Sequence, residues 1–176
     1  LQQAIDRAAP GDTIIVRDGN YTTSSAIAVK CAGTEGRPIT IAAATVGGVE
    51  IGGDAGFNVK APGAFVVIRG FRFTHHAGRE TIAPGTEHVR FSRNTFICSG
   101  EGADLTVSGD DVEVDHNEFR DKHTLGNMIS VTGHGHQVAR RLWIHHNYFH
   151  DFTSAHGNGA ETIRFGLSGL SLSNGD

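Results

Sequence analysis

The sequence has no run of eighteen apolar residues, so it offers no candidate for a transmembrane helix. It also has no excess of basic residues: 15 Lys and Arg stand against 19 Asp and Glu, which gives a formal net charge of −4. Non-specific binding of nucleic acid is therefore not favoured, because that binding needs an overall basic field. An anionic partner would need a local positive site.

Cysteine and several catalytic motifs are scarce or absent. Cys31 and Cys98 are the only two cysteines, and a single possible pair leaves both a disulfide and two thiols open, with two buried thiols favoured. The chain contains neither a Gly-x-Ser-x-Gly elbow nor a Gly-x-x-x-x-Gly-Lys loop. The sequence therefore gives no support to a serine hydrolase or a nucleotide-binding protein.

What is present is glycine, 24 residues of it, between short strand-like segments. Leu1–Ala9 has the apolar spacing of a short amphipathic helix and is followed by Pro10-Gly11. Two β-branched runs follow, at 12–16 and 38–41. The chain opens on Leu1 and closes within a pattern, so we expect a single domain over 1–176 that is truncated at both ends.

Four segments align without gaps, and each has apolar residues at its first, third and eighth positions. They are Val66–Phe73, Val89–Phe96, Val112–Phe119 and Leu142–Phe149. The last three also carry an asparagine two residues before the phenylalanine: Asn94, Asn117 and Asn147. Second short strands are expected between these units at 105–107, 129–131 and 163–165.

The phenylalanines of these units are 23, 23 and 30 residues apart. A repeat of this length, built from short strands without a helix, is typical of one coil of a parallel β-helix. A β-sandwich is the alternative, but it does not predict asparagines at a nearly fixed period. We therefore expect about six coils, with the helix at Leu1–Ala9 covering the first and the asparagines bonding backbone groups or each other at a turn.

Functional groups of such a solenoid belong on outward strand positions and in its longest loops. The longest loop leads from Phe149 to a strand that should place Ile163 and Phe165 inward and Arg164 outward. Asn158, between two glycines, could be a turn residue or could offer an amide oxygen to a hard cation. A guanidinium beside it suits a carboxylate or a sulfate.

The segment 158–168 resembles the signature of a known family. Asn158-Gly-Ala-Glu-Thr-Ile-Arg-Phe-Gly-Leu-Ser168 is similar to the Asn-Gly-x-Glu-Thr-Ile-Arg-Ile-Gly-x-Ser signature of polysaccharide lyase family six, which includes the alginate lyases and chondroitinase B. The opening Leu1–Ile5, the 18–21 and 38–41 segments, the Asn-x-Phe coils and Phe119–Lys122 agree with it. The resemblance covers nearly the whole chain.

The resemblance implies an all-β, right-handed parallel β-helix that cleaves anionic uronate polysaccharides by β-elimination. In that family a calcium ion neutralises the uronate carboxylate, a lysine removes the C5 proton and an arginine protonates the leaving O4. The family's calcium ligands are one asparagine, matched by Asn158, and a Glu-x-Glu pair further along. The chain ends 18 residues after Asn158, so the pair, the base and the acid have no counterpart in it and we expect these residues alone to be inactive.

Four further sets of residues have a predicted role or position. Arg164 is predicted to bind a substrate carboxylate, with a structural salt bridge as the alternative, and Lys122, one coil lower, is predicted to lie in the same anionic groove. Glu161 is expected to point inward, its carboxylate partly buried and bonded to loop amides. Eleven histidines suggest zinc, but they lack the ligand spacings, so surface and turn positions are favoured.

Three functions remain open from the sequence. The first is a calcium-dependent alginate lyase, the second a dermatan sulfate lyase, and the third a non-catalytic β-helix that binds carbohydrate. The expected cofactor is Ca²⁺, the expected partner is an anionic polysaccharide, and no nucleic acid or membrane span is expected. A substrate of this size places the protein outside the cytoplasm, secreted or periplasmic, and the oligomeric state stays open.

Overall fold

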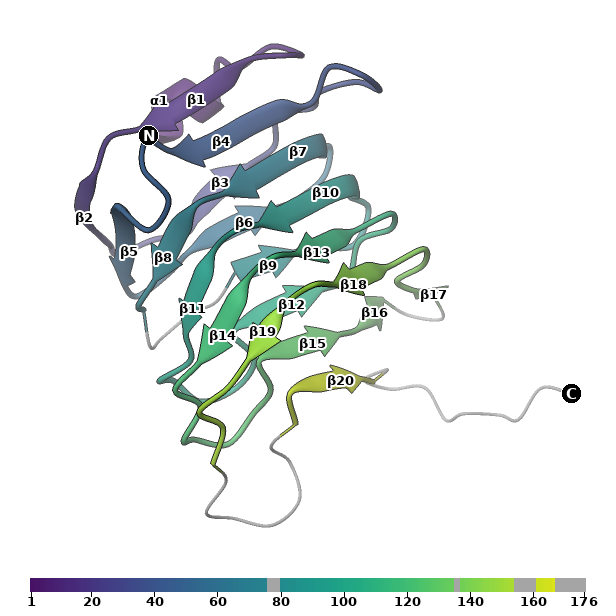
Figure 1. Cartoon of the computed structure of the whole chain (residues 1–176). Coiled ribbons are helices and arrows are strands. Elements are labelled where there is room, and N and C mark those ends of the chain that lie inside the picture. Colours follow the sequence, from purple (N-terminus) through teal and green to yellow (C-terminus); the bar gives the residue numbers. More distant parts are fainter. Residues whose placement is uncertain (76–79, 135–136, 154–160, 167–176) are drawn as a thin grey trace, which may run out of the picture.

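The computed structural model describes residues 1–75, 80–134, 137–153 and 161–166. These residues form a stack of short parallel strands with the N-terminal helix at one end (Figure 1). Three parallel sheets of six strands run along the stack, and successive strands of the chain belong to the three sheets in turn. The predicted all-β parallel β-helix is confirmed.

The strands of each sheet are as follows. The first sheet contains β1 (Thr13–Val16), β4 (Ile39–Ala43), β7 (Ala64–Arg69), β10 (Glu87–Ser92), β13 (Glu113–Asp115) and β18 (Trp143–His145). The second contains β2 (Gly19–Thr23), β5 (Val49–Gly53), β8 (Phe71–Phe73), β11 (Thr95–Ile97), β14 (Glu118–Arg120) and β19 (Tyr148–Phe149). The third contains β3 (Ile27–Val29), β6 (Phe57–Val59), β9 (Glu80–Ile82), β12 (Leu105–Val107), β15 (Ile129–Val131) and β20 (Ile163–Phe165). A short antiparallel hairpin, β16 (Gly133–His134) with β17 (Gln137–Val138), projects from the stack.

The four aligned segments each supply one strand to the first sheet and one to the second. Their inward residues are stacked in register, so that Phe96 lies between Phe73 and Phe119. The rings of Phe96 and Phe119 are 4.3 Å apart and nearly parallel, and the rings of Phe119 and Phe149 are 5.0 Å apart. Full burial of one such ring contributes about 2 to 3 kcal/mol, which makes this phenylalanine stack a main element of the core.

The repeated asparagines lie in the turn between the first and second sheets and bond to one another. Asn94 receives the backbone N–H of Phe71 on Oδ1 and donates from its own backbone N–H to Oδ1 of Asn117. Asn117 repeats this bond to Oδ1 of Asn147 at 2.9 Å, and its Nδ2 donates to the carbonyl of Phe91. The expected role of the asparagines is confirmed: each amide satisfies the turn of a neighbouring coil.

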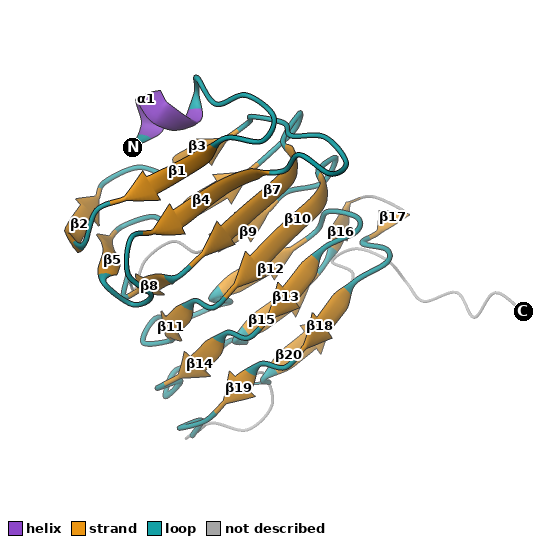
Figure 2. Cartoon of the chain, turned by 45° about the horizontal axis from the view of Figure 1, so that its top comes forward, coloured by secondary structure: helices purple, strands orange, loops and turns teal. Residues whose placement is uncertain are grey.

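The N-terminal helix is shorter than the sequence predicts. Helix α1 spans Gln2–Ile5, and beyond it Arg7 and Ala8 make i→i+3 backbone bonds that tighten the chain ahead of Pro10. It still covers the end of the stack (Figure 2): Ile5 is fully buried, and the side-chain amide of Gln2 bonds both backbone groups of Ala28 in β3. The predicted capping role is confirmed.

Both cysteines are free thiols, as favoured from the sequence, with Cys98 buried and Cys31 partly buried. No helix among the described residues is long and apolar enough to cross a membrane.

Candidate functional site

The outward face of the third sheet carries a row of small polar side chains. Because the strands are parallel and in register, outward residues of successive coils lie side by side along the stack. The row consists of Ala28, Asn58, Thr81, Thr106, Ser130 and Arg164. Its first five members are half-buried and Arg164 is exposed, so beyond the apolar Ala28 the amide and hydroxyl groups of the row lead to a guanidinium.

Arg164 lies where the sequence predicts it, on the outward side of β20 and opposite Ser130 of β15. Its guanidinium has no hydrogen bond or ion pair with any residue that the structure describes, unlike that of Arg90 or Arg120. The structural salt bridge weighed from the sequence is therefore not formed within the described chain. An unpaired guanidinium in this position is free to bind a carboxylate or a sulfate in bidentate fashion.

The inward positions of β20 also follow the prediction, with one difference. Ile163 packs against the core, and Phe165 pairs in register with the buried Val131. Phe165 is nevertheless 70% exposed. It lies on the last described strand of its sheet, so no described strand covers its ring.

Asn158, the predicted calcium ligand, lies outside the described residues. The nearest described oxygen ligand is Glu161, three positions along the chain and of intermediate burial, as expected. Its Oε2 is buried and has no hydrogen-bond partner within the described ranges, so the expected bonds to loop amides are not seen there. A carboxylate oxygen is a ligand type that Ca²⁺ prefers, but a calcium ion needs six to eight oxygen ligands, and Glu161 belongs to no group of possible metal ligands among the described residues.

Lys122 is not on the surface where the prediction of substrate binding requires it. Its side chain has no exposed area, and Nζ donates to the carbonyls of Gly100 at 2.6 Å and Gly102 at 2.9 Å. It also forms an ion pair with Asp104 at 3.2 Å. The predicted surface location of Lys122 is wrong. A buried ammonium loses its contacts with water, and here the oxygens of the neighbouring loop replace them. Lys122 therefore ties two loops together rather than facing an anionic groove.

Residues 1–176 match the family described as chondroitinase B over the whole chain. The chain belongs to the chondroitinase B family. No curated protein is similar to it at the level of sequence. The resemblance seen in the Asn158–Ser168 segment therefore points to the correct family.

Solved structures give the fold of this chondroitinase B family chain a second line of support. A mannuronic acid specific polysaccharide family 6 lyase from human gut microbiota is 21% identical, with a TM-score of 0.80, over 93% of this chain and 42% of its own. The family 6 alginate lyase AlyGC is 24% identical, with a TM-score of 0.81, over 94% of this chain and 24% of its own. A family 6 lyase from Pseudopedobacter saltans is 18% identical, with a TM-score of 0.77, over 99% and 41%. The chain thus spans less than half the length of each of these structures.

One group of possible metal ligands occurs elsewhere on this chondroitinase B family chain. Glu87 and His88, at the start of β10, and Asp111, just before β13, offer atoms within 4.8 Å of one another. Asp111, however, already accepts two hydrogen bonds from Arg141, at 2.5 and 2.6 Å, and these hold its pKa below its usual range in spite of some desolvation. The group belongs to a different turn from the Asn158 loop and is not the predicted calcium site.

Among the described histidines, His116 and His146 occupy turns, as the sequence favours, whereas His88 and His145 lie in strands β10 and β18 and His75 is buried against Glu80. His116 and His146 follow the first sheet in successive coils, both with positive φ, and their rings stack 5.2 Å apart beside the asparagine ladder. His145 stacks on the exposed Trp143 and bonds Glu113 through Nε2 at 3.1 Å. These rings therefore contact side chains of the same and of neighbouring coils.

Sequence reasoning missed a basic hollow on the outer face of the first sheet, near Arg69 and Arg93. Arginine occupies the fourth position of the first aligned unit and the fifth of the second. Strand alternation gives these two positions opposite directions, so the alignment does not bring the two guanidinium groups together. Arg93 directly follows β10 and has a positive φ, which alternation does not predict.

Proposed function

We propose that this chain supplies substrate-binding coils of a polysaccharide lyase that cleaves an anionic uronate polymer, with alginate as the first substrate, by calcium-assisted β-elimination. Membership of the chondroitinase B family carries the proposal. The polar row of the third sheet supports it, because the row ends at Arg164, which is exposed and has no partner among the described residues. Alginate is placed first because similar structures are described as alginate or mannuronic acid lyases.

In the proposed reaction the C5 proton of a uronate is removed, the C4–O4 bond breaks and a C4–C5 double bond forms. Arg164 would bind the carboxylate of the sugar and fix its orientation, while Ser130 and Thr106 would bond hydroxyl groups of neighbouring sugars. Asn158 would be one ligand of a calcium ion, which would supply positive charge at the uronate carboxylate and so ease loss of the C5 proton. The base and the acid have no proposed counterpart among residues 1–176.

A second candidate substrate is dermatan sulfate, because the matching family is described as chondroitinase B. A guanidinium binds sulfate as well as carboxylate, so Arg164 does not distinguish the two polymers. For either substrate we propose a secreted or periplasmic protein, since polymers of this size are degraded outside the cytoplasm.

The test is formation of the unsaturated uronate from polymannuronate, polyguluronate and dermatan sulfate, each with calcium and with chelator. It is carried out on the 176-residue chain and on any longer natural form of it. We expect the 176 residues to bind without cleaving and the longer form to cleave at least one polymer, with loss of the product in chelator. Cleavage that chelator does not change would overturn the role of calcium.

Variants of Arg164 separate binding from folding. Arg164→Ala should weaken binding of the preferred polymer about tenfold or more, since a charge-assisted bidentate contact is lost. Arg164→Lys should recover only part of it, and Arg7→Ala, a loss of charge at the helix end, should have no effect. Product from none of the three polymers in any form of the protein would leave a non-catalytic carbohydrate-binding β-helix and refute the lyase.

A further inference from the structure

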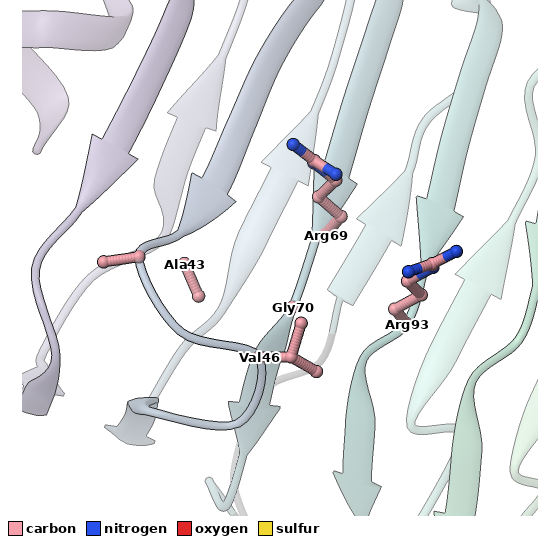
Figure 3. A pocket seen from close by; sticks show the side chains of 6 residues that line it. Ala43, Val46, Arg69, Gly70 and Arg93 are labelled. Carbon is pink, nitrogen blue, oxygen red and sulfur yellow. The ribbon is translucent and has the colours of Figure 1, made fainter.

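Two adjoining depressions on the outer face of the first sheet share two arginines. The smaller is about 140 Å³, and its lining is Ala43, Ala44, Val46, Arg69, Gly70 and Arg93. The larger is about 320 Å³, and its lining is Thr40, Val67, Arg69, Arg90, Ser92 and Arg93. We call the two together the arginine hollow; Figure 3 shows the side chains of Arg69 and Arg93 projecting from the ends of neighbouring strands beside it.

The two shared arginines are unpaired. Arg69 and Arg93 are both exposed, and neither guanidinium has a hydrogen bond or ion pair with any described residue. Arg90, at the side of the hollow, is different: it donates two hydrogen bonds to Asp115 and lies 3.5 Å from Glu113. Its charge is compensated, so the two free charges of the hollow are those of Arg69 and Arg93.

No acidic residue lines the hollow within the described chain, although the whole chain carries a net charge of −4. The acids beside it are already engaged: Asp115 holds Arg90, and Asp18 accepts the backbone N–H of Thr45 at 3.0 Å. An anion that enters the hollow therefore meets two positive charges without a competing carboxylate on its walls.

The floor between the charges is small and partly apolar. Gly70 has φ +81, a backbone conformation that favours glycine, and it adds no side chain to the hollow that it lines. Val67 and Val46 complete this floor. Apolar floor with charged walls suits a sugar ring that lies flat and carries an acidic group.

We propose that the arginine hollow is a second binding site for the carboxylate or sulfate groups of an anionic polysaccharide. The choice of ligand class rests on the proposed function. The site itself is separate, because Arg69 ends β7 and Arg93 follows β10, both strands of the first sheet, whereas Arg164 lies in the third. A polysaccharide held there is anchored to the protein at a distance from the proposed lyase site. This anchoring raises the local concentration of the polysaccharide near Arg164.

Nucleic acid fits the hollow less well. Its described lining contains no aromatic residue on which a base could stack, and two free guanidinium groups give only a small electrostatic contribution. A polyuronate carries one negative charge on each sugar, so a single guanidinium is enough to bind each acidic group.

The test measures binding in chelator, because this site needs no calcium. The 176-residue chain is titrated by calorimetry with oligomannuronate, a dermatan sulfate oligosaccharide, inorganic sulfate and a single-stranded DNA oligomer. Arg69→Ala/Arg93→Ala should weaken binding of the oligosaccharides by about tenfold or more. The control Arg7→Ala/Lys30→Ala, which removes the same charge elsewhere on the surface, should leave it unchanged.

Binding of oligomannuronate, which has carboxylates but no sulfate, would show that a carboxylate is sufficient, whereas binding of the dermatan sulfate oligosaccharide alone would indicate that sulfate is required. Arg69→Lys/Arg93→Lys keeps the charge without the planar donors and should recover only part of the affinity. Equal binding by the alanine pair and its control would overturn the inference, as would tighter binding of DNA than of either oligosaccharide or binding of inorganic sulfate alone. Urea unfolding of each variant confirms that these exposed substitutions leave the fold intact.

Failure of this site and failure of the proposed function are distinguishable. If the arginine hollow binds nothing while Arg164→Ala still abolishes calcium-dependent cleavage, only the second site is refuted. If no polymer is cleaved but the hollow still binds oligosaccharide in chelator, only the lyase is refuted.

Discussion

Arg90 donates two hydrogen bonds to the carboxylate of Asp115, at 2.7 and 2.8 Å, although the two residues lie 25 positions apart on neighbouring coils. Ser92 and His116 complete the shell around the same carboxylate, whose side chain is fully buried. The bonds tie β10 to β13 on the outer face of the first sheet. Because Asp115 compensates the positive charge of Arg90, that charge is not available to a ligand.

Asp115 should make the protein sensitive to acid. Burial alone would raise the pKa of Asp115, but the hydrogen bonds from Arg90, His116 and Ser92 outweigh it and hold that pKa well below its usual range. Because the folded pKa is lowered, the stabilisation is complete above the unfolded pKa, about 4, and is lost as the pH falls below it. The urea midpoint, measured from pH 7 downward, should lose this contribution only below about pH 4, and the midpoint of Asp115→Asn should fall less over the same range.

At neutral pH, Asp115→Asn should cost about 2 kcal/mol, since bonds to a charged partner are lost from a buried group. The matched control is Asp110→Asn, which breaks the more exposed pair with Arg140 and should cost less than about 1 kcal/mol. Equal losses in the two variants would contradict the difference in burial.

The asparagine ladder should be essential for stability. Asn117 is 2% exposed and bonds Asn94, Phe91 and Asn147. Asn117→Ala leaves buried backbone groups without partners on both sides, so we expect a loss of about 2 to 4 kcal/mol in urea unfolding. Asn20→Ala, at an exposed position of β2, should be neutral. A neutral result for Asn117→Ala would mean that water replaces the amide.

Lys122 and Asp104 should be coupled. Burial raises the pKa of Asp104, and the nearby ammonium of Lys122 opposes that rise. Lys122→Met leaves the acid without a cation and should cost about 3 to 5 kcal/mol. Adding Asp104→Asn should restore part of this loss, as a double-mutant cycle would show. Additive losses would indicate that the two side chains act independently.

His150 should titrate above the usual range. Nε2 bonds Glu118 and Nδ1 bonds Asp151, both at 2.9 Å, and these contacts raise the pKa of His150. Their stabilisation is present below the unfolded pKa and disappears as the pH rises through the folded one. An NMR titration should place the His150 pKa above that of the same residue in Glu118→Gln. Equal values in the two proteins would refute the contact with Glu118.

The sequence predicts most of the architecture because the apolar positions of the solenoid repeat. Phe73, Phe96 and Phe119 recur at one interval, and a constant interval in the chain becomes a constant register in the sheets. The helix at Leu1–Ala9 is overestimated because apolar spacing does not record the tightening of the backbone after Ile5.

The site is predicted less completely. The outward position of Arg164 follows from strand alternation alone. The burial of Lys122 does not, because the carbonyls that hold it come from Gly100 and Gly102, in a loop whose path has no local signature. The arginine hollow was missed because its two free guanidinium groups come from different units and meet only when the coils stack.

The polar row of the third sheet has a fixed pitch. Neighbouring strands are about 4.8 Å apart, so Thr81, Thr106, Ser130 and Arg164 recur at that interval along the axis of the stack. A ligand that lies along the stack therefore meets one polar side chain of this row for each coil that it crosses. Inserting a whole coil would move the guanidinium of Arg164 along the stack by one strand spacing, about 4.8 Å, and leave its surroundings unchanged. Lengthening a loop between strands would not change its position along the stack.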